Sequence, residues 1–224
     1  MRPPTIAEHQ VRDTLCGLGA QEVFDYIYRN NLWASDESLS GVGSQLDATA
    51  ELRRQLPLLF QELGVAILLD MPCGDFSWLS SIEYPFRRYI GGDIVPGVIE
   101  RNSRLFRESH PHAEFRVLDL TCDPLPFGDA LLCRDCLVHL PYAAIMDVFH
   151  NIARSCIRYV FMTTFVGSER SNTDIEIGNW RPLNFLQPPF SLPEPEKLLL
   201  EGCCEEDGAY ADKALGVWRV ECFR

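Results

Sequence analysis

Acidic residues recur at four points along the chain, each directly after an apolar run. Asp70, Asp93, Asp119 and Asp135 follow runs that have the composition of buried strands. Carboxylates accept hydrogen bonds from hydroxyl and amino groups and attract positively charged ligands. Because the carboxyl ends of parallel strands meet at one edge of a sheet, where ligands bind, we expect these four acids to surround a single ligand site.

The loop after the first apolar run indicates the class of ligand. It reads Asp70-Met71-Pro72-Cys73-Gly74-Asp75. A dinucleotide pyrophosphate needs more glycines and a helix start that is free of negative charge. Asp70 and Asp75 would repel a pyrophosphate, but they suit a ligand that carries an ammonium and a sulfonium group. With Asp93 placed to accept hydrogen bonds from ribose hydroxyls, the expected cofactor is S-adenosylmethionine (SAM).

The elements around these acids predict an α/β fold with a doubly wound, mostly parallel sheet. Strands are expected at 65–69, 88–92, 115–118, 130–133 and 159–164, and helices at 47–63, 76–82, 96–108 and 142–157. After a long loop over 167–195, the tail predicts a short helix at 196–200 and a terminal antiparallel hairpin of strands at 203–205 and 215–222. Residues 1–46 are expected to form an N-terminal helical extension that acts as a cap or gate over the cofactor. It would contain a helix at 20–29 and a Ser- and Gly-rich loop at 31–43. Residues 47–224 would then be the Rossmann-like domain.

In order and spacing, Asp70–Asp75, Asp93 and Asp119-Leu120 resemble the successive motifs of the class I SAM-dependent methyltransferases, over roughly residues 47–224. The terminal hairpin is similar to the reversed last strand of that family. The whole chain also resembles an uncharacterised small-molecule or glycan methyltransferase subgroup, which has an Asn-x-Trp plus Glu-Ser-x-Ser-Gly-x-Gly-Ser leader and a Trp-Arg-Pro-Leu-Asn loop. That subgroup implies no particular substrate.

The resemblance implies a set of cofactor contacts. The methionine part would be held by Asp70, Pro72, Cys73, Gly74 and Asp75, the ribose by Asp93, and the adenine by Ile94, Asp119 and Leu120. Arg134 is also expected at the cofactor; it could instead clamp a substrate carboxylate or pair with a neighbouring acid such as Asp135.

The methyl acceptor is expected after the fourth strand, where Asp135 and His139 are the candidate general bases. Cys133, Cys136 and His139 resemble part of a zinc site, but structural zinc needs four ligands and these residues supply at most three, so no metal is expected. Substrate contacts are expected on the two long loops, from Trp33, Ser38, Ser44, Asn172, Trp180, Arg181 and Asn184. So many carboxylates favour a neutral or cationic acceptor, such as a sugar hydroxyl or an amine of a small metabolite, or an anionic one held by Arg134 or Arg181. Both O- and N-methylation stay open.

Charge and composition narrow the class of protein. With 32 acidic against 20 basic residues, the net charge is -12, which argues against nucleic-acid and anionic-membrane partners. Residues 1–15 lack the apolar run of a signal peptide, and the nine cysteines indicate a reducing compartment, so a cytoplasmic protein is expected. Three alternatives stay open: a nicotinamide-dependent oxidoreductase, a non-catalytic methyltransferase-like binding protein, and a nucleic-acid methyltransferase with a separate basic subunit.

Overall fold

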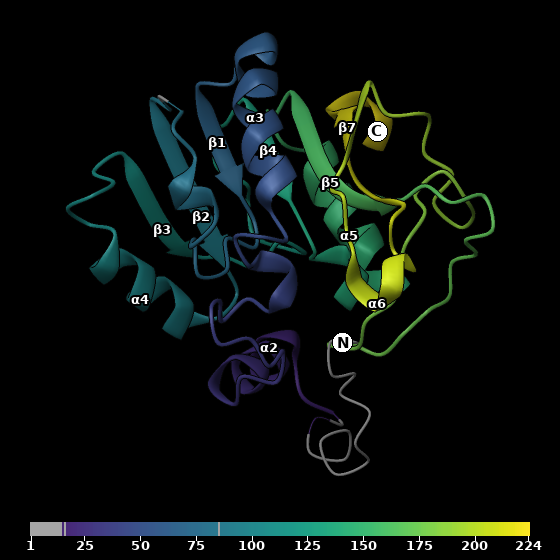
Figure 1. The fold of residues 1–224 in the computed structure, drawn as a ribbon, viewed down its shortest axis with the longest axis horizontal. Coiled ribbons are helices and arrows are strands. Elements are labelled where there is room, and N and C mark those ends of the chain that lie inside the picture. The colour runs from purple at the N-terminus through teal and green to yellow at the C-terminus, as the bar shows by residue number, and fades with distance from the viewer. Residues whose placement is uncertain (1–14, 16, 85) are drawn as a thin grey trace.

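The computed structural model describes residues 15, 17–84 and 86–224, which form one sheet with helices on both faces (Figure 1). The strand order is β3-β2-β1-β4-β5-β7-β6. The strands are β1 (Ile67–Asp70), β2 (Arg88–Asp93), β3 (Ala113–Val117), β4 (Ala130–Cys133), β5 (Tyr159–Phe165), β6 (Lys197–Leu200) and β7 (Lys213–Arg219). The first five strands are parallel, and β7 runs antiparallel to both β5 and β6. The predicted fold class is therefore confirmed.

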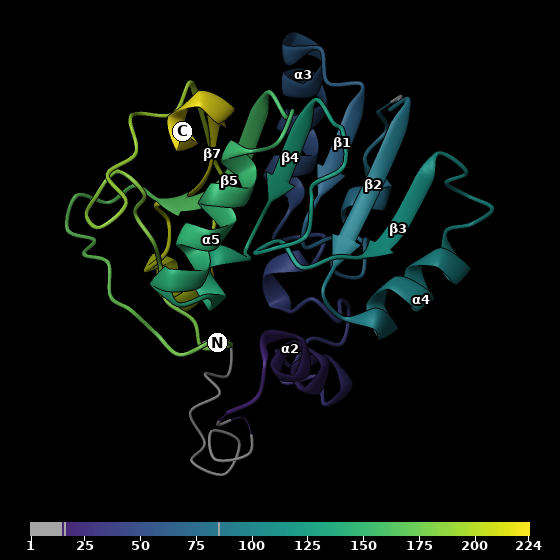
Figure 2. The ribbon, with the colours of Figure 1, turned by 180° about the vertical axis from the view of Figure 1, so that it is seen from behind.

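Helices cover the two faces of the sheet. The helices within the described residues are α2 (Ala20–Arg29), α3 (Ala50–Leu63), α4 (Pro96–Leu105), α5 (Tyr142–Ala153) and α6 (Glu205–Gly208). In α3, Leu52, Leu56 and Phe60 are fully buried against one face of the sheet, while α5 packs Ile145 and Val148 into the core of the other face. Figure 1 shows α3 in front of the sheet, and Figure 2 shows α5 from the opposite side. This burial of apolar surface is the main driving force for the fold.

Strand register brings the predicted acids to one edge of the sheet. Asp70, at the end of β1, lies opposite Gly91 of β2 and Leu132 of β4. Asp93 is the last residue of β2. In Figure 1, α2 lies across these strand ends, so the N-terminal part of the chain faces the edge at which the acids gather.

Three predicted elements are wrong. Residues 196–200 were expected as a helix, but they form β6, because alternation directs Leu199 into the core and the edge of β7 supplies hydrogen-bonding partners. Residues 203–205 are not a strand, so the hairpin consists of β6 and β7. Residues 76–82 contain only a 3₁₀ turn at Leu79–Ser81, since Phe76 has a left-handed conformation with φ 58°.

The long loops expected at 31–43 and 167–195 contain no strand and no α-helix, and a 3₁₀ turn at Val42–Ser44 ends the first of them. The division of the chain at residue 46 stays a prediction, and residues 1–14 of that segment lie outside the described part. Within the described residues, no helix has both the length and the apolar character that crossing a bilayer requires.

Candidate active site

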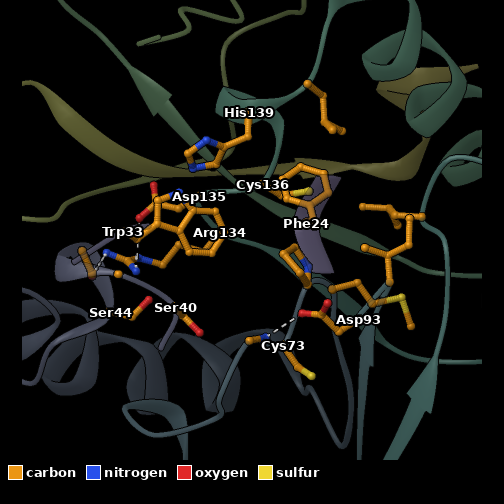
Figure 3. A pocket seen from close by; sticks show the side chains of 18 of the residues that line it. Phe24, Trp33, Ser40, Ser44, Cys73, Asp93, Arg134, Asp135, Cys136 and His139 are labelled. Atoms are coloured by element: carbon orange, nitrogen blue, oxygen red, sulfur yellow. Dashed lines mark hydrogen bonds and ion pairs between the residues drawn. The ribbon is translucent and has the colours of Figure 1, made fainter. Parts of the chain in front are cut away.

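A cavity of about 300 Å³ lies at the carboxyl ends of the parallel strands. Its wall contains all ten residues expected at the cofactor, namely Asp70, Pro72, Cys73, Gly74, Asp75, Asp93, Ile94, Asp119, Leu120 and Arg134. Both candidate bases, Asp135 and His139, line it too. Figure 3 shows several of these side chains around one space. The strand-end acids therefore share a single site.

Asp70 and Asp93 are buried carboxylates with few partners in the protein. The Tyr89 hydroxyl donates a hydrogen bond of 2.6 Å to Asp70, and the amides of Gly74 and Val95 donate to Asp93 at 3.2 and 3.0 Å. Burial raises the pKa of Asp70 to about 7 and that of Asp93 to about 6. Both carboxylates would thus gain from a ligand that brings positive charge or hydroxyl donors.

Unlike Asp70 and Asp93, Asp75 is hydrogen-bonded to the N-terminal part of the chain and holds it against the loop after β1. Its Oδ2 accepts hydrogen bonds from the Ser38 hydroxyl and the Leu39 amide, both at 2.9 Å. Its Oδ1 accepts from the amide and the hydroxyl of Ser77, at 3.2 and 2.7 Å. We call residues 38–44 the strap. Asp75 holds one end of the strap over the cavity.

Ser40 of the strap fits into the bend at Gly74. Its Oγ accepts a hydrogen bond of 2.8 Å from the Asp75 amide. A side chain at Gly74 would place its Cβ 2.2 Å from that oxygen, and Gly74 also has a φ of 50°. The bend therefore requires glycine for both backbone conformation and space.

Asp119, which the sequence predicts to border the adenine, lines the cavity. Its Oδ1 accepts hydrogen bonds from the amide and the hydroxyl of Thr121, at 2.8 and 2.6 Å. Phe24 and Tyr28 of α2 also line the cavity. The sequence marks both aromatic residues only as members of a helical apolar pattern, which by itself does not distinguish a cavity wall from a core.

Arg134 lies in a cluster of four charges with Glu201 and Lys213, which are also buried, and with the partly exposed Asp135. Its guanidinium donates to Glu201 at 2.6 Å and to the Gly43 carbonyl at 2.9 Å, and it lies 3.3 Å from Asp135. The Lys213 ammonium is 2.7 Å from Asp135 and 3.4 Å from Glu201. Arg134 is thus paired with the acids, as one of the sequence alternatives held, and it anchors the second end of the strap.

This cluster determines the state of Asp135. Burial alone would raise the pKa of Asp135, but Lys213 and Arg134 lower it well below its ordinary value. A carboxylate that holds its charge so firmly is a weak proton acceptor. The sequence does not point to Lys213 or Glu201, because nothing in their local pattern distinguishes them from surface charges.

His139 is the better placed of the two candidate bases. Its Nδ1 is 3.0 Å from the Asn179 carbonyl oxygen, and since a carbonyl can only accept, Nδ1 carries the proton and Nε2 is left as the acceptor. Burial, helped by Arg181 and Lys213, lowers the pKa of His139 to about 4, so the ring is neutral at pH 7. The ring of Trp33 lies 5.3 Å from that of His139, centroid to centroid.

Of the seven expected substrate residues, Trp33, Ser44 and Trp180 line the cavity. The other four, Ser38, Asn172, Arg181 and Asn184, are absent from its wall and hold the loops in place. Arg181 donates to the carbonyls of Leu137 and Leu140 at 2.8 and 2.6 Å. The Gly178 amide donates to the His139 carbonyl at 2.9 Å. The loop over 172–189 therefore orients both Trp180 and His139.

Among the described residues, no group of three or more His, Cys, Asp and Glu side chains is arranged to hold a metal ion. Cys133 is buried within β4, and Cys136 lies at the cavity wall.

No protein-family model and no curated protein matches the sequence. Among solved structures, the chain is similar to human N-acetylserotonin methyltransferase in complex with SAM, with a TM-score of 0.61 and 15% identity over 91% of this chain and 60% of that one. The methyltransferase domain of a bacterial Hen1 gives a TM-score of 0.55 and 13% identity over 78% of this chain and 100% of that one. Magnesium protoporphyrin IX methyltransferase of Synechocystis with bound SAH gives a TM-score of 0.50 and 14% identity over 67% of this chain and 74% of that one.

These identities are low, so the likenesses concern the fold, and the chain spans only 60% of the length of the human enzyme. The strand order, the antiparallel β7 and the cavity at the strand ends agree with them. The chain therefore has the fold of the class I SAM-dependent methyltransferases.

Proposed function

We propose that this chain is a SAM-dependent methyltransferase that acts on an O or N atom of a small molecule. The observation that carries the proposal is the pair of buried carboxylates, Asp70 and Asp93, in one cavity with the neutral ring of His139. When bound, SAM supplies a methyl group on a positively charged sulfonium. The two carboxylates fit this ligand, because within the described residues neither Asp70 nor Asp93 has a cationic side chain within hydrogen-bonding distance.

Each acid has a part in binding. Asp93, at the end of β2, accepts hydrogen bonds from the two ribose hydroxyls, and Asp70 receives the ammonium group of the methionine part. Ile94 and Leu120 pack against the adenine ring. The strap closes the cavity from the N-terminal side, since Asp75 and Arg134 hold its two ends.

His139 acts as the general base for the methyl acceptor. Its Nε2 takes the proton that the acceptor oxygen or nitrogen loses during transfer, and the Asn179 carbonyl keeps the ring in the tautomer that allows this. The paired state of Arg134 and Arg181 leaves neither guanidinium free to clamp an anionic acceptor. The acceptor is therefore neutral or cationic, and with the net charge of -12 we propose a cytoplasmic protein that acts on a metabolite or sugar and has no nucleic-acid partner.

Calorimetric titration with S-adenosylhomocysteine (SAH), in parallel with NAD and NADP, tests the proposal. We expect SAH to bind with micromolar affinity and the nicotinamide cofactors not to bind, because their pyrophosphate would lie at the loop after β1, between the carboxylates of Asp70 and Asp75. Asp93→Asn should weaken SAH binding by about 1–3 kcal/mol, whereas Asp207→Asn, at an exposed site, should leave it unchanged.

The opposite results are equally informative. Binding of NAD or NADP without SAH would indicate an oxidoreductase. If SAH binds but no methyl transfer is found across a panel of alcohols, phenols and amines, a methyltransferase-like binding protein would be the better description.

A further inference from the structure

The acceptor end of the cavity presents two hydrogen-bond acceptors next to one another. One is His139 Nε2, left open because Nδ1 is the atom bonded to Asn179. The other is Asp135 Oδ1: the cations paired with this carboxylate, Lys213 and Arg134, lie against Oδ2, and no described residue forms a hydrogen bond or ion pair with Oδ1. The Asp135 side chain is 25% exposed. Figure 3 shows His139, Asp135 and Trp33 together at one end of the cavity.

This end of the cavity offers no free positive charge. Within the described residues, Arg134 and Lys213 are the only lysine and arginine side chains in the cavity wall, and Asp135 and Glu201 neutralise both. The cluster therefore sums to zero charge. An acceptor with a carboxylate or phosphate would find no cation to pair with.

Additional positive charge is also disfavoured here. Burial is the largest effect on the His139 imidazole and disfavours its protonated form, and this effect outweighs the opposing contributions of the Asn179 carbonyl and Asp135. A cationic amine beside His139 would lose its hydration through the same burial. These features favour an uncharged acceptor.

Flat aromatic surfaces border the same space. Trp33 lies beside His139, and Trp180 is packed at 5.0 Å from Tyr210 and 6.1 Å from Phe165, between ring centroids. Aromatic faces of this kind pack well against another ring. A ring-shaped acceptor thus fits the walls, and the two open acceptor atoms need donors from it.

We propose that the methyl acceptor is an uncharged ring that carries at least two hydroxyl groups, one bound by Asp135 Oδ1 and the other methylated beside His139. Aromatic diols and saturated cyclic polyols share this chemistry. The proposal rests on the proposed function and adds the substrate class to it.

In the transfer step, the acceptor oxygen forms a bond to the methyl carbon of SAM as the carbon–sulfur bond breaks, and the bonding pair remains on sulfur. The hydroxyl proton passes to His139 Nε2 and from there to solvent. Asp135 keeps its charge throughout and holds the second hydroxyl, so it fixes which oxygen faces the methyl group.

Binding to the SAH-saturated protein tests the proposal without a turnover assay. Ligand-observed NMR titrations would compare catechol with phenol, and cis-1,2-cyclohexanediol with cyclohexanol. We expect the dihydroxy ligand of at least one pair to bind about tenfold more tightly than its monohydroxy partner, because it gains a charge-assisted hydrogen bond. Preference within the first pair would indicate an aromatic acceptor, and within the second pair a saturated one.

Two variants test whether Asp135 causes the preference for the dihydroxy ligand. Asp135→Asn weakens the hydrogen bond but leaves the buried cluster with excess positive charge, so the double variant Asp135→Asn, Lys213→Met serves as its charge-balanced partner. In whichever of the two melts cooperatively and binds SAH, the advantage of the second hydroxyl should fall to about threefold or less. If neither meets these criteria, the wild-type comparison decides.

Equal affinity for dihydroxy and monohydroxy ligands in the wild-type protein would overturn the proposal, as would an undiminished advantage in a folded variant. If SAH binds but no dihydroxy preference is seen, only the substrate class is wrong. If SAH itself does not bind, the proposed function fails and this inference fails with it.

Discussion

Affinity for SAH should depend on pH through Asp70 and Asp93. Both carboxylates must be ionised to receive an ammonium group and ribose hydroxyls, yet burial raises their pKa values to about 7 and about 6. Binding therefore requires that protons leave the site. The amino and carboxyl groups of SAH do not titrate near neutral pH, so the pH dependence belongs to the protein.

The two pKa values give the size of the effect. The fraction of protein with both groups ionised is about 0.9 at about pH 8 and about 0.05 at about pH 6, a loss of about 20-fold in affinity. Binding should release about 1.4 protons per ligand at about pH 6 and close to zero at about pH 8. In Asp70→Asn only Asp93 titrates, so the change in affinity should shrink to about twofold.

Calorimetry in buffers of different ionisation enthalpy measures affinity and proton release together. The melting temperature of the ligand-free protein provides an internal check, because it should change with pH in the direction opposite to the affinity for SAH. A carboxylate whose pKa is raised in the folded state destabilises the fold as pH increases from about 4 to about 7, so the melting temperature should fall over the range in which affinity rises. Affinity that is flat between about pH 6 and 8, without proton release, would refute the assignment of these acids to the ligand.

Three further changes have defined outcomes. Gly74→Ala should lower the free energy of unfolding by about 1–3 kcal/mol in urea titrations, because its Cβ meets Ser40; at Gly64, which has a similar φ but open space around it, Ala should cost no more than about 1 kcal/mol. Asp75→Ala should speed amide hydrogen exchange in the strap but not in β1, and uniform protection would argue against its role as the anchor. His139→Gln should leave SAH affinity within about twofold and slow methyl transfer by about 10²–10⁴-fold, so an unchanged rate would return His139 to a structural role.

The fold and the gathering of the strand-end acids around one cavity were predictable because they follow from local patterns. Buried parallel strands read as continuous apolar runs, and their carboxyl ends share one edge, so acids such as Asp70 and Asp93 could be placed together without coordinates. The three leucines of β6 were ambiguous by comparison. A short apolar run fits a buried helix or a strand, and only the pairing with β7 decides.

The acceptor half could be predicted only in part. Arg134 and Glu201 are 67 positions apart, and Asp135 and Lys213 are 78 apart. No local periodicity reports contacts over such separations. The residues that brace the long loop, such as Arg181, have the same polar character as residues that bind substrate, and only their hydrogen bonds to backbone carbonyls distinguish them.

The cluster around Arg134 has a consequence for how the molecule is made. It connects the strap, β4 and the final hairpin, with Gly43 and Arg134 91 positions apart. During synthesis, β1–β5 can emerge and pair while Lys213 is still inside the ribosome. A nascent chain then has its strand-end acids in place before Glu201 and Lys213 reach Arg134 and Asp135, and because distant contacts form slowly, the charge cluster is completed among the last steps of folding. Binding at the end of the cavity beside Asp135, rather than binding at Asp70 and Asp93, should thus distinguish finished molecules from those that have only an assembled sheet.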